Sequence, residues 1–333
     1  RIVLAMNIDQ LRQGVNQALD SQVTQYCATI AEIDDQLIPI ANSLKDYLSE
    51  GKRFRPLFSL LGFLGADGQL SPNVYKAAAA LEFLQASALI HDDLMDGSDT
   101  RRGKPAMHKQ FGDAAAVLIG DLALVWNEQA LHQSGMQSDA LNNIHDIMRT
   151  ELMAGQFLDV YEQTQETYSV ERSLKIARYK SGKYSIERPL HYGAALASPK
   201  NLDIFIDIYS EYGLPLGEAF QLRDDLLGVF GDPAETGKPA GDDLREGKRT
   251  ALIAYAYDRG DAATKKLIDQ KLGTADIDGL AEAIENSGAP IHVEDLIEKL
   301  SEAALDAVER DEINIEAKAL LVEMVGVVTK RNR

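Results

Sequence analysis

The chain is poor in cysteine and in long apolar runs, and each shortage excludes a class of protein. A single cysteine, Cys27, excludes a disulfide framework and any zinc or iron–sulfur site built from several cysteines. No run approaches the roughly 18 apolar residues of a membrane helix, and the longest candidate, Ala114 to Gly120, stops at Asp121. No signal-peptide pattern occurs either. We therefore expect a soluble, cytoplasmic protein without stable membrane insertion.

Basic residues are also scarce. The 34 lysines and arginines stand against 52 acidic residues, which gives a net charge of −18 with histidine neutral. Nucleic acid is therefore excluded as the main partner, because phosphate binding along a duplex or strand needs a broad basic surface. The apolar fraction of 45% and the charged fraction of 26% are ordinary for a globular chain with a packed core.

Apolar residues recur at spacings of three and four through most of the chain, which predicts one helix after another. The segments are 44–48, 57–64, 77–90, 114–131, 141–160, 174–179, 204–219, 251–257 and the last forty residues. Sustained alternation of β-branched and aromatic residues, which is typical of strands, is absent. Ser71-Pro72 has the pattern of a helix N-cap, and the polar segments 97–105 and 231–247 interrupt the helical periodicity. The fold class predicted is all-α.

Two acidic clusters lie on apolar helical segments. Asp92 and Asp96 are four residues apart, so a helix places both carboxylates on one face, one turn above the other. The segment 221–228 repeats this chemistry with Asp224 and Asp225. In so acidic a chain most aspartate pairs belong to solvated faces, but these two are flanked by leucine, isoleucine and methionine. Carboxylates in such surroundings need a compensating cation, and magnesium takes carboxylate and phosphate oxygens.

Several compact basic groups lie beside glycines in this otherwise acidic chain. Lysine and arginine on such turns are suited to gripping phosphate oxygens. A single Gly-Lys turn is more often a simple helix end. Five of them together with two acidic clusters indicate phosphate groups bound both directly and through metal. The groups are 51–56, 101–104, 180–183, 237–238 and 247–249.

These motifs resemble those of the trans-prenyltransferases, the polyprenyl diphosphate synthases that join allylic diphosphates to isopentenyl diphosphate. They follow the order of that family over roughly residues 45–255. They are Gly-Lys-Arg-x-Arg-Pro at 51–56, DDxxD at 92–96, Arg-Arg-Gly at 101–103, Lys-Ser for the usual Lys-Thr at 180–181, Phe-Gln with the second acidic motif at 220–225, and Gly-Lys at 237–238 and 247–248. The resemblance implies a single all-α domain over 1–333, an isoprenoid-synthase-type helical bundle around a central cavity, and a homodimer.

The resemblance also implies a set of site residues. Three magnesium ions would be held by Asp92, Asp96 and Asp224, with Asp93 and Asp225 in support. The allylic diphosphate would be bound by Arg101, Lys180, Lys238 and Lys248, and isopentenyl diphosphate by Lys52, Arg55, Gln85 and Arg102. The carbonyl of Lys180, the hydroxyl of Ser181 and the amide of Gln221 are the candidates for steadying the allylic cation. His91, beside Asp92, is a weaker candidate as a base than as a packing residue.

One position departs from the family pattern. Gly228 stands where the second acidic motif has its last aspartate. Asp224, the first aspartate of that motif, should still hold the third ion, and Asp232 on the following loop is a candidate for contributing through water. Serine at 181 keeps the hydroxyl, and Gln85 takes a position where the family has histidine or glutamine.

Product length should follow from the residues one to three turns before Asp92. In short-chain members of the family a bulky aromatic residue near 87 or 88 closes the pocket, whereas Ser87 and Ala88 are small. The prenyl tail should therefore pass beyond fifteen carbons, which favours geranylgeranyl diphosphate, with farnesyl and longer products left open. Residues expected to close the pocket further down are Leu84, Leu81, Trp126 and Phe157.

Four other readings of these motifs have specific difficulties. A class I terpene cyclase shares DDxxD but needs a second motif with Asn, Ser or Thr and Glu. A His-Asp metal phosphohydrolase needs a histidine before His91, and none occurs. A di-iron bundle needs Glu-x-x-His repeats, which are absent. A non-catalytic regulatory subunit of the same fold usually loses the first acidic motif or the arginine pair, and both are present here.

Overall fold

The computed structural model describes residues 6–198, 200–236 and 239–330, and these are almost entirely helical, which confirms the all-α prediction. Strand structure in the described part is confined to a short hairpin. The elements are α1 (Ile8–Ala31), η1 (Asp35–Leu37), α2 (Ile38–Ser49), α3 (Phe54–Gly65), α4 (Pro72–Asp96), β1 (Thr100–Arg101), β2 (Lys104–Pro105), α5 (Met107–Phe111), α6 (Asp113–Ser134), α7 (Asp139–Gln163), α8 (Val170–Ile176), η2 (Ala177–Glu187), α9 (Arg188–Ala197), α10 (Leu202–Phe230), α11 (Pro233–Thr236), α12 (Asp242–Glu246), α13 (Ala251–Arg259), α14 (Ala262–Lys271), α15 (Leu280–Asn286), α16 (Ala289–Ala307) and α17 (Ile315–Thr329).

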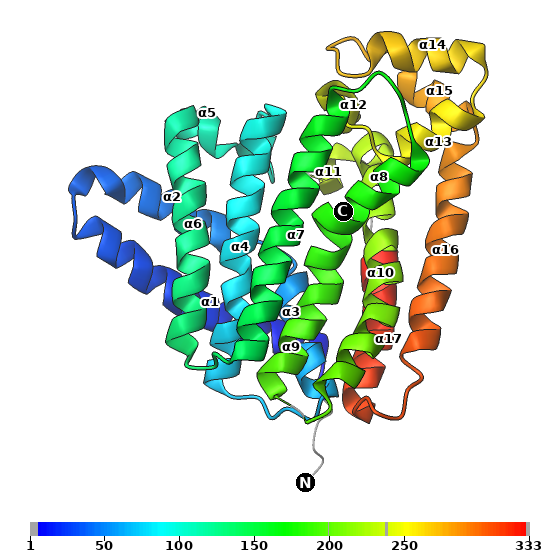
Figure 1. Cartoon of the computed structure of the whole chain (residues 1–333). Helices are drawn as coiled ribbons and strands as arrows, with labels where there is room; N and C mark the ends of the chain where they lie inside the picture. The colour runs from blue at the N-terminus through cyan, green and yellow to red at the C-terminus, as the bar shows by residue number, and fades with distance from the viewer. Residues whose placement is uncertain (1–5, 199, 237–238, 331–333) are drawn as a thin grey trace.

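The long helices stand side by side (Figure 1). Helix α4 packs extensively on α6, α3 packs on α9, and α10 packs on both η2 and α16. Buried alanines at 77–80 let neighbouring helices approach α4 closely, and α4 is apolar around most of its circumference, as a central helix should be. A large apolar cluster involves α1, α3, α4, α6, α9 and α17, and a smaller one joins part of α10 to α12–α16.

Local capping signals fix where α4 begins and ends. Ser71 Oγ accepts a hydrogen bond from the Val74 amide, and Pro72 occupies the first turn, as the sequence predicts. Gly97 ends the helix in the left-handed conformation, with φ of 68°. The helix therefore stops directly after its acidic residues, which places them in its last turn.

The polar segment after α4 forms the hairpin. Thr100 pairs with Pro105 and Arg101 pairs with Lys104 in antiparallel register. Arg102 and Gly103 form the turn, both with positive φ, at 53° and 74°. The hairpin holds Arg101 next to the acidic end of α4, whereas Arg102 lies against the carbonyls at the end of α2.

In the described part of the chain one helix, α6, is long and apolar enough by length and composition to cross a bilayer. Its inner face packs on α4, and Asn127 on that face donates a hydrogen bond to the Ala80 carbonyl at 2.8 Å. A helix of a protein core satisfies the same test of length and composition, so this one helix is weak evidence for a membrane span.

Candidate active site

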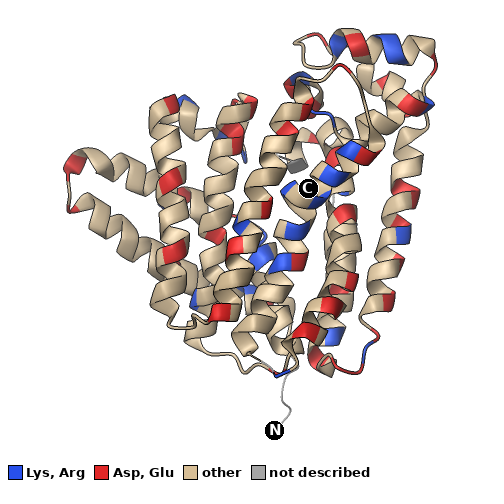
Figure 2. Cartoon of the chain, viewed as in Figure 1, with Lys and Arg blue, Asp and Glu red and all other residues tan. Residues whose placement is uncertain are grey.

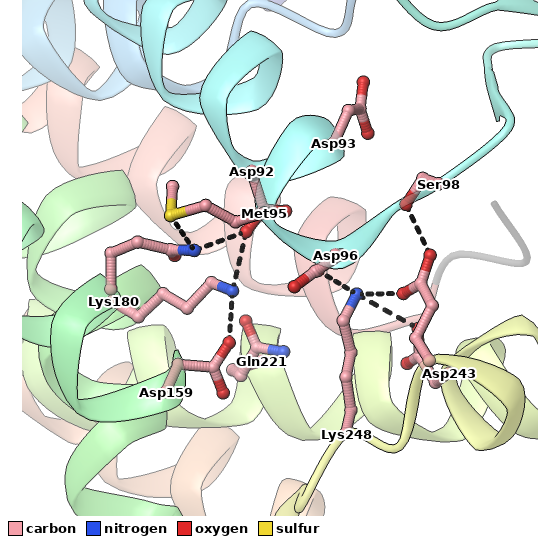
Figure 3. A network of polar contacts seen from close by, with 12 residues as sticks. Asp92, Asp93, Met95, Asp96, Ser98, Asp159, Lys180, Gln221, Asp243 and Lys248 are labelled. Atoms are coloured by element: carbon pink, nitrogen blue, oxygen red, sulfur yellow. Dashed lines mark hydrogen bonds and ion pairs between the residues drawn. The ribbon is translucent and has the colours of Figure 1, made fainter. Parts of the chain in front are cut away.

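The end of α4 carries three carboxylates, from Asp92, Asp93 and Asp96 (Figure 3). The C-terminal end of a helix carries partial negative charge, so acidic residues there are unfavourable without cations. The structure supplies these cations from three other segments, which carry Arg101, Lys180 and Lys248. Figure 2 shows Lys and Arg positions (blue) close to Asp and Glu positions (red) along the ribbons of the central helices.

Lys180 bridges two acids from different helices. Its Nζ lies 2.9 Å from Asp92 Oδ1 and 2.6 Å from Asp159 Oδ2. Gln156, one turn before Asp159 on α7, donates to the same Asp92 oxygen at 2.8 Å. Burial alone would raise the pKa of Asp92, but Lys180, Lys248 and Arg101 together hold it well below its ordinary value. Asp92 is therefore ionised throughout the physiological pH range.

Lys180 lies in η2, which is a π-helix, a wider form that often occurs at functional sites. Two glycines on neighbouring helices allow close packing against it. A Cβ on Gly155 of α7 would lie 2.3 Å from the backbone nitrogen of Lys180, and a Cβ on Gly217 of α10 would lie 2.6 Å from Gly182 Cα. Side chains at 155 or 217 would force these helices apart and move Lys180 away from Asp92.

Lys248 contacts the second aspartate of the α4 motif. Its Nζ lies 3.1 Å from Asp96 Oδ2, 2.6 Å from Glu246 Oε2 and 3.5 Å from Asp243 Oδ1. The Asp96 side chain is only 1% exposed, and neither of its oxygens accepts a hydrogen bond. Burial raises the pKa of Asp96, an effect that Lys248 opposes and Asp92 reinforces.

This buried carboxylate, which is ion-paired with Lys248 but accepts no hydrogen bond, fits a metal ion. A buried carboxylate is costly unless a cation or donor approaches its free oxygens, and hard ions such as magnesium bind such oxygens. Among the described residues no group of three or more acidic, histidine or cysteine side chains converges as a metal site by itself. Magnesium commonly takes one or two carboxylates and draws other ligands from substrate phosphates and water. The residues present therefore fit magnesium bound together with a diphosphate.

Asp93 points away from the other two carboxylates (Figure 3). Arg101 Nε lies 3.0 Å and 3.1 Å from its two oxygens, and Arg101 Nη2 donates to it as well. Arg101 Nη2 also lies 3.9 Å from Asp92 Oδ2. Asp93 thus holds the arginine of the hairpin beside Asp92.

The second acidic motif is built differently. Asp225 is buried, and its oxygens accept from Gln221 Nε2 at 2.8 Å and from the Ala251 amide at 3.1 Å, at the start of α13. Burial raises its pKa to about 7, although the hydrogen bond from Gln221 acts in the opposite direction. Asp225 therefore ties α10 to α13. Asp224 is half-buried and shares a helix face with Gly228, four residues on.

The residues expected to bind isopentenyl diphosphate form a connected group. Arg55 Nη2 donates to Ser185 Oγ at 2.7 Å, and its guanidinium stacks 4.2 Å from the centre of the Tyr184 ring. The Tyr184 hydroxyl donates to Gln85 Oε1 at 2.8 Å, which links Gln85 to Arg55. The buried Arg55 Nε has no hydrogen-bond partner, so an anion could accept from it.

The loop at 51–53, directly before α3, brings Arg102 close to Lys52, the other two residues expected to bind isopentenyl diphosphate. Arg102 Nη1 donates to the carbonyls of Tyr47 and Glu50 at 3.0 Å each, and Lys52 Nζ lies 5.6 Å from the centre of the Phe54 ring. A Cβ on Gly51 would lie 3.5 Å from Arg102 Nη2. This contact places the hairpin arginine against the loop that carries Lys52.

The residues proposed to set product chain length lie on α4, one to three turns N-terminal to Asp92. Leu81, Leu84 and Ser87 are buried, Ala88 is half-buried, and the Ser87 hydroxyl has no hydrogen-bond partner. Trp126 is also buried, and its ring contacts Phe83 and Tyr26.

Three sequence-based expectations need correction or qualification. Phe157 is 70% exposed on the outer face of α7, so it cannot close a pocket within one chain. Asp232 accepts from the Ala234 amide at 2.8 Å and so caps α11. Lys238 lies outside the described residues. His91 turns toward α6, where its Nε2 is 3.0 Å from the Val117 carbonyl, as the packing role requires.

Sequence reasoning missed several residues that complete the site. They are Gln156, Asp159, Tyr184, Ser185, Asp243 and Glu246. A signal existed for the first two, because Gly155-Gln156 and Asp159 interrupt an otherwise helical apolar segment at helical spacing. The others depend on long-range contacts that have no pattern along the chain.

Comparison with known proteins identifies the arrangement. The family model described as Polyprenyl synthetase matches residues 39–286. The chain is 33% identical over 295 residues to the geranylfarnesyl diphosphate synthase of Aeropyrum pernix, covering 84% of this chain and 90% of that protein. It is 30% identical over 285 residues to the short chain isoprenyl diphosphate synthase of Methanocaldococcus jannaschii, covering 82% and 81%.

Solved structures agree with this match. The geranylgeranyl pyrophosphate synthase of Corynebacterium glutamicum, complexed with isoprenyl diphosphate and magnesium, superposes with a TM-score of 0.91 at 39% identity, covering 98% of this chain and all of that one. The polyprenyl synthase of Caulobacter crescentus, complexed with calcium and isoprenyl diphosphate, gives a TM-score of 0.83 at 28% identity, covering 98% and 96%.

Proposed function

The chain belongs to the polyprenyl synthetase family and is a prenyl diphosphate synthase of the short-chain type, and we propose that it makes geranylgeranyl diphosphate. The reaction joins isopentenyl diphosphate head-to-tail to allylic diphosphates. Relatives are named farnesyl, geranylgeranyl and geranylfarnesyl diphosphate synthases, so the family leaves product length open. The proposal of a twenty-carbon product rests on the small residues Ser87 and Ala88 below the acidic turn.

Asp92, Asp96 and Asp224 would hold the magnesium ions, three per site. Bound magnesium supplies positive charge that stabilises the departing diphosphate of the allylic substrate. Arg101, Lys180, Lys248 and Lys238 would bind the same diphosphate. In the described structure Lys180 and Lys248 already lie against Asp92 and Asp96, so the carboxylates are neutralised before substrate arrives. With magnesium held by these carboxylates, Lys180 and Lys248 would be free to bind the diphosphate oxygens.

The second substrate would be held without metal. Lys52, Arg55, Gln85 and Arg102 would bind the diphosphate of isopentenyl diphosphate, and the unpartnered Nε of Arg55 supports this role. The connection from Gln85 through Tyr184 to Arg55 fixes the guanidinium in place. The allylic group ionises, the double bond of isopentenyl diphosphate attacks the cation, and a proton is lost to the released diphosphate.

Polar groups near the reacting carbon would steady the cation. The candidates are the Lys180 carbonyl, the Ser181 hydroxyl and the Gln221 amide. Gln221 donates its amide N–H to Asp225, and its carbonyl oxygen points toward the polar network (Figure 3). A carbonyl dipole held in this way favours positive charge nearby at no cost of reorientation.

Product analysis tests the proposed length. Purified protein, magnesium and labelled isopentenyl diphosphate are incubated with five-, ten- and fifteen-carbon allylic starters, and the products are separated by chain length. A twenty-carbon limit is expected, and Ser87→Phe should shorten it to fifteen carbons or fewer because the ring fills the space below the acidic turn. A wild-type limit at fifteen carbons, or a Ser87→Phe product unchanged in length, contradicts the proposal.

We also propose that the enzyme works as a homodimer. Apolar side chains at helical spacing are exposed on α6 and α7, and such patches mark interfaces. They are Val117, Leu118, Val125, Ile147, Met153, Phe157, Val160 and Tyr161. Light scattering should give twice the chain mass, and Phe157→Glu, at a 70% exposed position, should reduce it to one chain mass without unfolding. A monomeric wild type contradicts the dimer.

A further inference from the structure

The position of Gly228 is filled by a side chain from another element. A Cβ built on Gly228 would lie 1.9 Å from Oδ2, 2.5 Å from Cγ and 3.2 Å from Cβ of Asp243. Real Cβ atoms do not approach so closely, so a side chain at 228 and the observed Asp243 carboxylate exclude each other. The carboxylate of α12 therefore lies against α10 in the space into which an aspartate at 228 would project.

This location joins the two acidic clusters. Gly228 follows Asp224 by one helical turn and lies on the same face of α10. The other oxygen of Asp243 lies 3.5 Å from Lys248 Nζ, which in turn lies 3.1 Å from Asp96. Figure 3 shows Asp243 beside Lys248 at the end of the network.

We propose that Asp243 supplies the carboxylate that the second acidic motif lacks. Asp224 and Asp243 together then form the second pair of carboxylates at the diphosphate site, in addition to Asp92 and Asp96. Asp243 acts as a positioning residue: it orients Lys248 and places negative charge where the cation of a magnesium–diphosphate complex is needed. The inference rests on the proposed function, because it assumes that this end of the bundle binds that complex.

The test is binding of inorganic diphosphate, measured by calorimetry with and without magnesium. With magnesium, Asp243→Asn should weaken binding about tenfold, the loss expected for one charge-assisted contact. Without magnesium, the same variant should bind diphosphate as well as the wild type or better, because a charge that repels the anion is gone. A purely structural role would weaken binding in both conditions, which would overturn the proposal.

Moving the carboxylate from position 243 to position 228 gives a second, independent test. Gly228→Ala should weaken magnesium-dependent binding as Asp243→Asn does, because its methyl group displaces the carboxylate. The double variant Gly228→Asp/Asp243→Ala should restore the affinity to within about threefold of wild type, whereas Asp243→Ala alone should not. If the double variant is folded by circular dichroism and binds no better than Asp243→Ala, the proposal is wrong.

Matched controls separate this inference from the proposed function. Asp242→Asn makes the same charge change one residue away on α12, and Asp232→Asn removes the other candidate for the missing carboxylate. Both should bind magnesium–diphosphate as the wild type does, and a tenfold loss in either would move the role from Asp243 to that residue. If the wild type itself shows no magnesium-dependent binding, the proposed function fails, whatever the variants do.

Discussion

The two acidic motifs look alike in sequence but are built differently in space. On α4, Asp92 and Asp96 face each other across one turn and are matched by Lys180 and Lys248. On α10, Asp225 is withdrawn into hydrogen bonds with Gln221 and the Ala251 amide. The carboxylates of the first motif thus belong to a single helix, whereas the geometry of the second motif depends on how α10 packs against α12 and α13.

This difference matters for how each motif tolerates change. A helix fixes the separation of residues four apart, so the spacing of the two carboxylates in the first motif needs only one well-formed helix end. Under our proposal, the second motif tolerates glycine at 228 because the Asp243 carboxylate of α12 occupies the same space. Family signatures read along the chain therefore underestimate what a neighbouring segment can replace.

The largest expected effect comes from breaking the local motif. Asp92→Asn and Asp96→Asn should each lower kcat by at least about a hundredfold, because under the proposed function each would replace a charged carboxylate ligand of the magnesium that stabilises the leaving group. Steady-state incorporation of isopentenyl diphosphate measures this. Asp99→Asn, an exposed acid three residues after Asp96, is the matched control and should retain full activity. Activity within threefold of wild type for Asp96→Asn would contradict the assignment.

Removing the matching lysines should have the next largest effect. Lys180→Met and Lys248→Met should each weaken magnesium-dependent binding of diphosphate by about ten- to a hundredfold, since a charged donor to the phosphate oxygens is lost. The carboxylates left behind would repel each other more strongly, so the affinity for magnesium without diphosphate should rise. Calorimetry measures both the affinity for diphosphate in the presence of magnesium and the affinity for magnesium alone. Lys175→Met, on the exposed part of α8, should change neither.

The smallest effect on turnover, with the clearest effect on folding, is expected for Asp225 on α10. Asp225→Ala removes the acceptor at the start of α13 and should lower the free energy of unfolding by about 1–2 kcal/mol. Asp224→Ala should leave stability nearly unchanged and lower kcat far more than Asp225→Ala does. Urea denaturation together with turnover separates the two. Equal losses of turnover and stability in both variants would show that the neighbouring aspartates share one role.

Much of this molecule could be predicted from periodicity and spacing. The predicted helical segments within 57–160 and the breaks at Gly97 and Gly231 lie where the structure has them, because capping residues and apolar faces act locally. Helix α1 was not among the predicted segments, although its buried residues recur every three or four positions. The all-α class therefore followed from local signals.

The exposure of individual helix faces and the pairing of residues in the site depend on contacts between distant segments, which the sequence pattern does not show. Phe157 shows the limit, because helical periodicity does not reveal which apolar face turns outward. Asp243 shows it more sharply, since nothing along the chain connects it with Gly228, fifteen positions earlier. Close packing alone reveals that pair, and it is also what brings Asp159 onto Lys180.

The most direct test of the central claim is incorporation of labelled isopentenyl diphosphate onto farnesyl diphosphate, with magnesium and after its removal by chelation. A twenty-carbon product is expected with magnesium, none after chelation, and full recovery when magnesium is restored. Incorporation that survives chelation, or no condensation with any allylic starter, would contradict that claim.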